Sequence, residues 1–444
     1  MKHETDDGRA SAIYSIDVHP DGTRFATGGG DNHARIWSIA PVTSQECQDD
    51  EINNPKLLAI ATRHDAAVNV VRWSHDGVHL ATGSDDTNII IWRCMPGVSA
   101  LGNVENWCSN TMLQGHTSDV KDLDWSPNDD LLATCSIDNT VRVWRINEAT
   151  LGQLRVNVPL VVLKGHTSWV RGLCWDPVGK YLASTSDDNT MIVWRSSDWK
   201  QEVVVDEPFQ GAPTVSTVRR LGWSPDGTTI CASHAFQHPR HVASIVERTT
   251  WTSNLNLVGH ETAVGAVRFN GRLFQPSSQS KKKKKKKRGA LRACCAIGSQ
   301  DATLSIWVAA NPRALAIVNK LFDAEISDLS WNSGNVGGNG LTLLACSLDG
   351  SVVCLQFEDH ELGDICPVSA TKDRLKELYG ASVSGVFGCG LVCGLVVVWL
   401  WLVVVCAYVV CAYVVCAYVV CAYVVWLWFG LWFVPMCCTC VAHF

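Results

Sequence analysis

The sequence lacks the motifs by which most catalytic and metal sites are recognised. It contains no nucleophile elbow, no phosphate-cradling glycine loop and no HExxH helix. Gly28 to Gly30 precede Asp31 in an expected hairpin, so they form a turn rather than a nucleotide loop. His234, His238 and His241 fall in a proline-containing loop, which favours a plain polar hairpin over a metal site. We therefore predict no catalytic residues, no cofactor and no metal.

Charge is missing from the end of the chain. Gly380 to Phe444 contain no Lys, Arg, Asp or Glu, and Cys-Ala-Tyr-Val-Val occurs four times over residues 406–425. An uncharged apolar run this long could span a bilayer, but a five-residue period matches neither a helix nor a strand. The favoured residues share G- and T-rich codons, so a fifteen-base repeat would generate the pentapeptide. We interpret residues 381–444 as a low-complexity tail of doubtful authenticity, read through from non-coding sequence, with a membrane segment as the alternative.

Signals of secretion and of disulfide bonding are also missing. Met1 to Arg9 is polar and charged, unlike a signal peptide. Of the 20 cysteines, nine follow Cys366, and those before that point form no CxxC pair. A reduced cysteine within a strand packs as a small apolar side chain. We therefore expect the body of the chain to reside in a reducing compartment.

What the sequence does contain is an internal repeat of roughly fifty residues. In three copies a His is followed at 20, 22 and 28 residues by Ser, Asp and Trp. A fourth copy keeps the last three positions, and its His is displaced upstream by an insertion. The repeated residues are His64, Ser84, Asp86 and Trp92; His116, Ser136, Asp138 and Trp144; His166, Ser186, Asp188 and Trp194; and His260, Ser299, Asp301 and Trp307.

Short apolar runs fill the space between the repeated polar residues. Val120 to Trp125, Leu131 to Cys135 and Thr140 to Trp144 are separated by turn-forming clusters, which indicates antiparallel strands joined by hairpins. Four such strands per repeat predict an all-β fold, a seven-bladed β-propeller over residues 1–365. Residues 366–380 are expected to form a linker with a short helix.

We interpret the repeated polar residues as structural ties, one set in each blade. A His, a hydroxyl, an Asp and an indole N–H can form one hydrogen-bonded chain, and buried polar groups need such partners. His, Ser and Asp together also suggest a catalytic triad. The set recurs in several blades, however, whereas an enzyme needs one site. The sequence therefore predicts a non-catalytic binding platform.

Two regions depart from the repeat. The fifth blade, expected over Val218 to Glu247, keeps the turn after Trp223 but lacks the later Trp. No apolar run precedes Ile13, although propellers usually close by letting an N-terminal strand complete the last blade. We therefore expect either a shortened start or weak closure of the ring.

A basic run interrupts the sixth blade. Like charges in a row favour a solvated loop, with a nuclear-import signal or a phosphate-contacting patch as alternatives. No aromatic residue interleaves with the lysines, which disfavours single-strand nucleic-acid binding. The run comprises Lys281, Lys282, Lys283, Lys284, Lys285, Lys286, Lys287 and Arg288.

The body resembles the WD40 propeller of the histone-regulator (HIRA, Hir-type) family of histone chaperones. Similar stretches include Asn103 to Trp107, Trp175 to Ala183, Cys294 to Asp301 and Ser347 to Ser351. The resemblance covers roughly residues 1 to 380 and includes a basic insertion in blade six. The related WD40 subunit of chromatin assembly factor one is less similar around Asn103 to Trp107.

The resemblance implies a non-catalytic nuclear scaffold that helps to deposit core histones independently of DNA replication and represses transcription through chromatin. Its expected partners are a ubinuclein-type subunit and core histones. The family pattern is lost near Gly380, which leaves binding of an ASF-type chaperone and trimerisation in doubt.

Three alternative functions stay open. One is a subunit of the chromatin assembly factor one type, and another is a generic WD40 scaffold such as a ubiquitin-ligase substrate receptor. Ligase receptors usually carry Trp-Asp-x-Arg, which does not follow the repeated tryptophans. A membrane-tethered scaffold requires the tail to be genuine.

Overall fold

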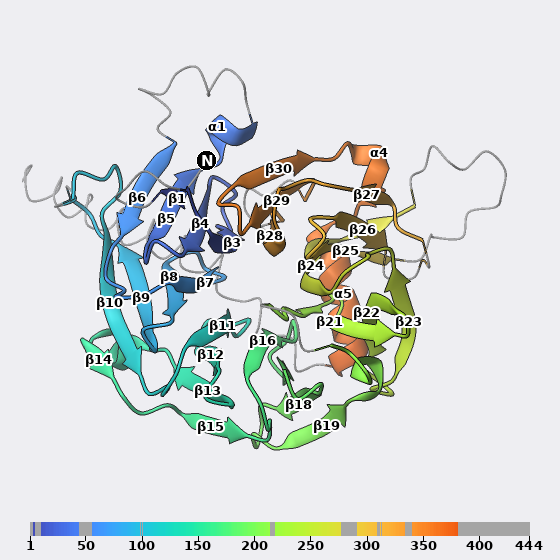
Figure 1. Cartoon of the computed structure of the whole chain (residues 1–444). Coiled ribbons are helices and arrows are strands. Elements are labelled where there is room, and N and C mark those ends of the chain that lie inside the picture. The colour runs from blue at the N-terminus through green and yellow to red at the C-terminus, as the bar shows by residue number, and fades with distance from the viewer. Residues whose placement is uncertain are drawn as a thin grey trace, which may run out of the picture. The chain divides into compact units, whose positions relative to one another are not determined.

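The computed structural model describes residues 3–4, 10–43, 56–97, 99, 101–213, 218–276, 291–308, 311, 313–333 and 340–380. In these residues, seven antiparallel sheets are arranged as blades around a common axis (Figure 1). The predicted seven-bladed β-propeller is therefore confirmed. The basic run over 281–288 and the tail over 381–444 lie outside the described residues. Of the helices in the described part of the chain, none has both the length and the apolar character needed to cross a membrane.

The first three blades follow the order of the chain. Blade one comprises β3 (Ile13–Val18), β4 (Arg24–Gly29), β5 (Ala34–Ser38) and β6 (Leu57–Ala61), with helix α1 (Ala40–Thr43) between the last two. Blade two comprises β7 (Val68–Trp73), β8 (His79–Ser84), β9 (Asn88–Cys94) and β10 (Trp107–Gln114), and β14 (Arg155–Val156) pairs in parallel with β10. Blade three comprises β11 (Val120–Trp125), β12 (Leu131–Ser136), β13 (Thr140–Arg145) and β15 (Val161–Lys164), with helix α3 (Glu148–Leu151) after β13.

The remaining blades continue around the axis. Blade four comprises β16 (Val170–Trp175), β17 (Tyr181–Ser186), β18 (Met191–Arg195) and β19 (Gln201–Val205), followed by the 3-10 helix η1 (Glu207–Phe209). Blade five comprises β20 (Gly222–Trp223), β21 (Thr229–Gln237), β22 (Arg240–Glu247) and β23 (Ser253–Val258). Blade six comprises β24 (Val264–Gln275), β25 (Arg292–Ser299), β26 (Leu304–Val308) and β27 (Ala316–Val318). Blade seven comprises β28 (Ile326–Trp331), β29 (Thr342–Ser347) and β30 (Val352–Gln356).

The hairpin between the second and third strands of a blade needs one residue with positive φ. Asn139 in blade three (φ 65°) and Asn189 in blade four (φ 59°) occupy this position. Asparagine tolerates the left-handed conformation because its short side chain bonds locally. The turn residues that separate the apolar runs in the sequence therefore set the register, in which Leu132 pairs with Trp144.

The hydrophobic core is divided into clusters that lie between neighbouring blades. One cluster joins Ile89 and Ile91 of blade two to Leu123 and Trp125 of blade three, all of them buried. Each strand turns alternate side chains to the two faces of its sheet. Each blade therefore contributes to one cluster on either side. Burial of apolar area between adjacent sheets is thus the main force that holds the ring together.

Closure of the ring uses side chains rather than a shared sheet. Strands β1 (His3–Glu4) and β2 (Ala10–Ser11) pair with each other, and within the described residues no strand pairs with the outer edge of β30. Instead, the Ser327 hydroxyl donates to the Ile13 carbonyl at 2.6 Å, and the Ser15 hydroxyl donates to the Asp328 carboxylate at 2.8 Å. Both bonds are buried and join the inner strands of blades one and seven.

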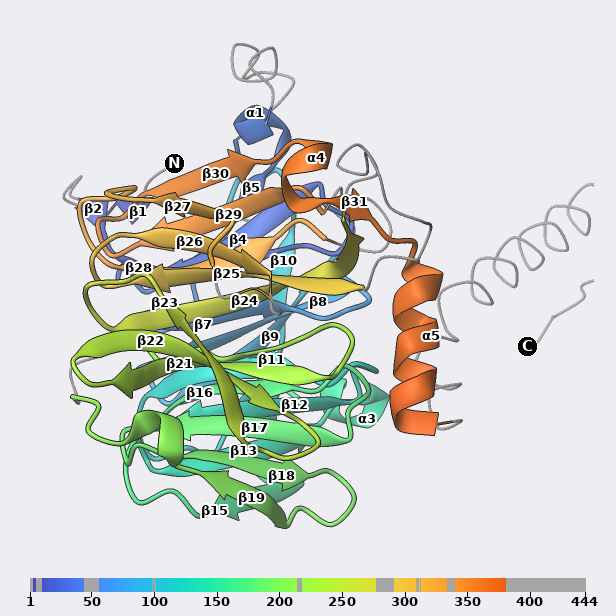
Figure 2. The same cartoon turned by 90° about the vertical axis from the view of Figure 1, so that its right-hand side faces the viewer.

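The chain after blade seven returns to one face of the disc (Figure 2). Helix α4 (Asp359–Leu362) is followed by β31 (Asp364–Ile365), which pairs with the end of β24, and by helix α5 (Val368–Tyr379). At the end of α5, the Arg248 guanidinium lies 4.0 Å from the Tyr379 ring centroid, and the Tyr379 hydroxyl donates to the Gly227 carbonyl at 3.4 Å. The segment therefore bridges blade six and blade five.

Candidate functional site

A chain of buried hydrogen bonds crosses blade three. The Trp144 indole N–H donates to the Thr134 hydroxyl at 3.0 Å, His116 Nε2 lies 2.9 Å from that hydroxyl, and His116 Nδ1 lies 2.8 Å from the Asp138 carboxylate. An indole can only donate and an ionised carboxylate can only accept, so Trp144 donates to Thr134 and His116 Nδ1–H donates to Asp138. With the imidazole neutral, Nε2 carries no proton and accepts from the Thr134 hydroxyl.

Blades two and four repeat this arrangement. In each of them the hydroxyl lies between the indole and the histidine at 2.7–2.9 Å, and the carboxylate lies at 2.7–3.0 Å from Nδ1. The four members are Trp92, Thr82, His64 and Asp86 in blade two, and Trp194, Ser184, His166 and Asp188 in blade four.

The ionisation states suit this chain. Burial alone would raise the pKa of Asp138, but hydrogen bonds from His116, from the Thr140 hydroxyl and from the Thr117 amide hold it well below its usual range. Burial lowers the pKa of His116 and outweighs the opposing effect of Asp138. The histidine is thus neutral and the aspartate ionised, and in this combination every donor of the chain has an acceptor.

The hydroxyl predicted from the sequence is not the one in the chain in three blades. Ser84, Ser136 and Ser186 lie two residues after Thr82, Thr134 and Ser184 on the same strand face. Each instead donates to a carbonyl of the preceding loop at 3.0–3.1 Å and accepts the amide N–H of the Asp two residues later. The sequence comparison missed the true hydroxyl because it alternates between Thr and Ser, whereas the neighbouring Ser is identical in all copies.

Blade six places its predicted Ser299 within the chain. His260 Nδ1 lies 2.9 Å from the Ser299 hydroxyl, which donates to the Asp301 carboxylate. On the other side, His260 Nε2 and the Trp307 indole each lie 2.7 Å from the Ser305 hydroxyl. The order of donors and acceptors is the same as in blade three, except that the Ser299 hydroxyl lies between the histidine and the carboxylate.

Blade one has a chain that sequence reasoning missed. Its histidine is His3, which lies 2.7 Å from the Thr27 hydroxyl and 2.9 Å from the Asp31 carboxylate, and Trp37 donates to Thr27 at 2.7 Å. Thr27, Asp31 and Trp37 have the same spacing as Thr134, Asp138 and Trp144. That spacing was the available signal, but His3 lies six residues farther upstream than the repeat predicts.

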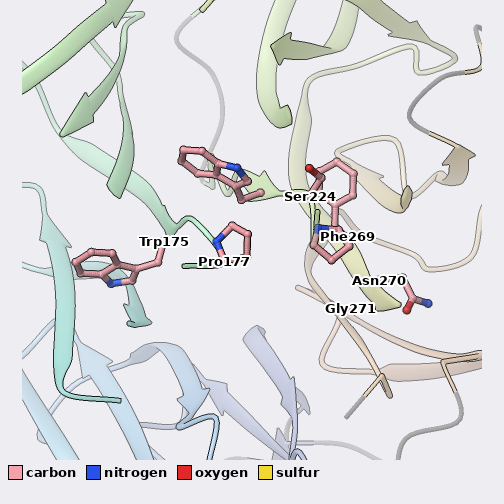
Figure 3. A pocket seen from close by; sticks show the side chains of 8 residues that line it. Trp175, Pro177, Ser224, Phe269, Asn270 and Gly271 are labelled. Atoms are coloured by element: carbon pink, nitrogen blue, oxygen red, sulfur yellow. The ribbon is translucent and has the colours of Figure 1, made fainter. Parts of the chain in front are cut away.

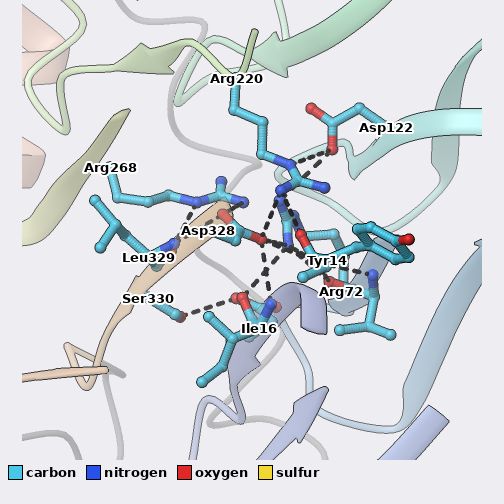
Figure 4. Close-up of polar contacts among 12 residues, drawn as sticks. Tyr14, Ile16, Arg72, Asp122, Arg220, Arg268, Asp328, Leu329 and Ser330 are labelled. Carbon is cyan, nitrogen blue, oxygen red and sulfur yellow. Dashed lines mark hydrogen bonds and ion pairs between the residues drawn. The ribbon is translucent and has the colours of Figure 1, made fainter. Parts of the chain in front are cut away.

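A second polar cluster occupies the axis of the ring (Figure 4). The Arg220 guanidinium donates to the carbonyls of Tyr14 at 2.8 Å, Ser327 at 2.7 Å and Asn69 at 2.9 Å. These carbonyls belong to blades one, seven and two, and Arg220 itself precedes the inner strand of blade five. One buried side chain therefore joins four blades.

Two carboxylates balance the charge at the axis. Asp328 lies 2.8 Å from the Arg72 guanidinium and 3.5 Å from that of Arg220, while Asp122 lies 3.5 Å from both. Burial would raise the pKa of Asp328, but the surrounding guanidinium groups hold it well below its usual range. Asp122, Arg220 and Asp328 each stand three residues before the aromatic residue that ends an inner strand, and this shared position was the signal in the sequence.

Among the residues that the structure describes, one large aromatic side chain is exposed. Trp169, in the loop before β16, is 48% exposed, and the Arg171 guanidinium lies 5.0 Å from its ring centroid. Trp107 and Trp199 pack against Trp73 and Trp175, with ring centroids 5.1 Å and 6.0 Å apart. Trp169 is therefore the candidate contact residue.

The part of the chain that the structure describes holds no group of three or more His, Cys, Asp or Glu residues placed to bind a metal ion. The three histidines lie on the hairpin of β21 and β22, where His234 Nε2 is 2.7 Å from the Pro213 carbonyl. Since a carbonyl only accepts, Nε2 carries the proton. His238 and His241 lie instead beside the Phe236 ring.

Comparison with known proteins agrees with this architecture and with the resemblance in the sequence. The family model described as the CAF1B/HIR1 beta-propeller domain matches residues 7–362. Protein HIRA of Gallus gallus is 44% identical over 384 residues, and protein HIRA of Homo sapiens is 44% identical over 386; each match covers 84% of this chain and 36% of the relative. Protein HIR1 of Cryptococcus neoformans is 41% identical over 384 residues, 85% of this chain and 41% of the relative. The chain thus spans 36–41% of the length of these relatives. It belongs to the CAF1B/HIR1 β-propeller family, and within it to the HIRA type.

Proposed function

We propose that this chain is a non-catalytic binding subunit of a HIRA-type histone chaperone complex in the nucleus. There it contributes to replication-independent nucleosome assembly and to transcriptional repression through chromatin. The observation that carries the proposal is the match to HIRA proteins, at 44% identity over 84% of the chain. Its expected partners are a ubinuclein-type subunit and core histones.

The geometry supports binding at the faces of the ring. The axis is filled by the Arg220 network, and Asp122, Arg220 and Asp328 are at most 3% exposed at the side chain. A rigid ring of this kind presents its loops in fixed positions, which lowers the entropy cost of binding. Trp169 with Arg171 beside it is the best candidate anchor, because tryptophan and arginine dominate the energetics of protein interfaces.

A second candidate is a subunit of the chromatin assembly factor one type. The matching family model covers CAF1B as well as HIR1 propellers. The two candidates differ in the partners that they bind, so one capture experiment distinguishes them.

The full-length chain is immobilised and incubated with nuclear extract, and the retained proteins are identified by mass spectrometry. We expect a ubinuclein-type subunit and histones, and we expect Trp169→Ala to reduce their recovery at least tenfold. Val158→Ala is the matched control, since Val158 is also an exposed apolar residue, at 81%. Recovery of only ligase adaptors or vesicle-coat subunits would contradict the chaperone proposal, and recovery of the other chromatin assembly factor subunits would favour the second candidate.

A further inference from the structure

Two places in the ring differ from the regular blade. One is a shallow pocket where blades four, five and six meet, lined by Trp175, Trp223 and Phe269 among others (Figure 3). Its volume is about 180 Å³, below the roughly 300–1,000 Å³ of small-molecule sites. The Trp223 indole N–H is buried and has no hydrogen-bond partner, so it is closed off from a ligand as well. The other place is the outer edge of blade seven.

Blade seven ends at its third strand. Each of the other six blades has a fourth strand at its outer edge, whereas the described residues place none beside β30. None of the five residues of β30 is buried, although the third strand of every other blade contains at least three buried residues. Within the described part of the chain, the outer edge of β30 is therefore open.

This open edge presents main-chain hydrogen-bonding groups. In the hairpin of β29 and β30, the Phe357 amide donates to the Leu341 carbonyl at 2.8 Å, and the Ser347 amide donates to the Ser351 carbonyl at 3.2 Å. Hydrogen-bonded pairs alternate along an antiparallel ladder, so the odd-numbered residues of β30 bond to β29. The even-numbered residues turn their N–H and C=O groups to the open edge, and these are Val352, Cys354 and Gln356.

The open edge is recessed between its neighbours. Blades one and six, on either side of blade seven, extend outward by their fourth strands β6 and β27. Since neighbouring strands are about 4.8 Å apart, the edge of β30 lies roughly one strand spacing inside the rim formed by β6 and β27. A second copy of the ring cannot pair with it edge to edge, because the two rims would meet while the edges were still about 10 Å apart. A single extended segment fits the recess.

Both walls of the recess are apolar. On the blade-one side, Leu57 of β6 packs against the same hydrophobic cluster as Cys354. On the blade-six side, Val318 of β27 packs against the same cluster as Leu355. Because successive residues of a strand point to opposite sides, a segment that fits needs apolar side chains at consecutive positions. It also needs its N–H donors, which excludes proline where it faces β30.

We infer that the outer edge of blade seven accepts an extended aliphatic segment of a partner protein as its fourth strand, by β-augmentation. The segment pairs with the even-numbered residues of β30 and covers Leu57 and Val318. It does not have to bring the histidine that follows four of the other fourth strands, because His3 already completes the hydrogen-bonded chain of blade one. The inference goes beyond the proposed function, since this site lies on the outer rim and Trp169 stands beside an inner strand.

Binding is tested by fluorescence anisotropy with the full-length chain and a labelled peptide, Leu-Val-Val-Leu-Lys, which copies residues 160–164 at the outer strand of blade three. The control peptide, Leu-Pro-Pro-Leu-Lys, has the same length but lacks two N–H donors. We expect the first peptide to bind at least tenfold more tightly than the second. Equal affinity for the two peptides, or a dimer of the chain in sedimentation with no peptide binding, would overturn the inference.

Two pairs of variants locate the bound peptide. Cys354→Pro removes an outward N–H and should weaken binding at least fivefold, whereas Cys354→Ala keeps that N–H and should stay within twofold of the wild type. Val318→Lys places a charge in the recess and should weaken binding about tenfold. Ile317→Lys is its matched control, since Ile317 is already 48% exposed. Unchanged binding by both Cys354→Pro and Val318→Lys would contradict the site, and Trp169→Ala should bind the peptide like the wild type, which separates this test from that of the proposed function.

A second measurement does not depend on how the variants fold. Hydrogen exchange of the wild-type chain is followed at single amides by NMR, with and without the peptide. Saturating peptide should slow exchange at least tenfold at Val352, Cys354 and Gln356. Val353 and Leu355 should exchange slowly in both states, because they already bond to β29. Unchanged exchange at the three outward amides would refute strand addition.

Discussion

Blade three and blade five have the same four antiparallel strands, but different interactions hold them. In blade three, Trp144, Thr134, His116 and Asp138 form one hydrogen-bonded chain. In blade five, Ala232 and Val246 stand at the strand positions of Thr134 and Trp144, according to the strand pairing. The internal chain is therefore impossible in blade five.

Blade five is held by its neighbours instead. Trp251, from the turn after β22, packs edge-on against Trp223 and against Tyr181 of blade four, at 6.3 Å and 5.5 Å. Arg220 joins the blade to carbonyls of three others. The comparison teaches that a repeat unit can lose its own ties when its contacts with the rest of the ring replace them. The residues that repeat in a sequence reveal the ties within a blade, but not the contacts between blades.

The largest expected effect comes from breaking the external anchor. Arg220→Ala removes the buried hydrogen bonds to three carbonyls and takes away one of the guanidinium groups that offset the buried charges of Asp122 and Asp328. This should cost about 3–5 kcal/mol. Denaturation followed by circular dichroism measures this loss. Arg220→Lys should restore only part of the stability, since a lysine lacks the guanidinium fork. Arg195→Ala, which breaks exposed ion pairs with Asp198 and Glu202, is the control and should leave the midpoint nearly unchanged. A similar midpoint for the two Ala variants would contradict the role of Arg220.

The next effect comes from breaking the internal chain of blade three. Thr134→Val has nearly the same shape but leaves the Trp144 indole and His116 Nε2 unpaired, which should cost about 2–3 kcal/mol. Thr134→Ser keeps the hydroxyl, as Ser184 does in blade four, and should cost less. Thermal unfolding compares the two variants. Equal losses would mean that the methyl group, not the hydroxyl, matters at this position.

Lowering the pH should reduce the free energy of unfolding through a histidine in each of the two blades. Burial lowers the pKa of His116, and it lowers that of His234 in blade five to about 4. The unfolded chain, with a histidine pKa of about 6.5, then binds more protons than the native state, so stability falls as the pH is lowered below about 6.5. For His234 the loss between pH 7 and pH 5 should be about 2 kcal/mol. His234→Gln should flatten the dependence of the denaturation midpoint on pH, and an unchanged slope would show that His234 does not titrate in this range.

The smallest effect compares two tryptophans at equivalent positions. Trp125→Phe and Trp223→Phe remove similar volumes, but only Trp125 donates to a carbonyl, that of Arg72. Trp125→Phe should therefore be less stable than Trp223→Phe by about 1 kcal/mol. Denaturation curves of the two variants, measured side by side, give this difference. The reverse order would show that Trp223 has a native partner within the ring.

The sequence predicts the blades well because strands and hairpin turns are local features. Asn139, for example, lies between two strand patterns, and its neighbours alone predict a hairpin turn there. The ties were harder to assign. Thr134 and Ser136 project from the same side of β12, and sequence alone does not say which hydroxyl reaches the histidine. His3 was missed because the spacing to its partners differs from the repeat.

The axial network depends on which residues meet across the ring. Asp122, Arg220 and Asp328 are separated by about a hundred residues each, and nothing near any of them in the sequence indicates the other two. Aligning the repeats on the tryptophans that end their inner strands places Asp122, Arg220 and Asp328 at the same position of the repeat. Even so, the lack of an acceptor for the Trp223 indole N–H follows only from three-dimensional packing.

The closure between blades one and seven sets the order in which the molecule can be completed. The bond from Ser327 to Ile13 spans 314 positions, so it cannot form until nearly the whole ring has been synthesised. At about 5–20 residues per second, the first inner strand waits roughly 15–60 seconds on the ribosome for its partner. The entropy cost of closing so long a loop grows only with the logarithm of its length. During synthesis the open side of blade one therefore presents to the cell the polar groups and apolar surface that blade seven later covers.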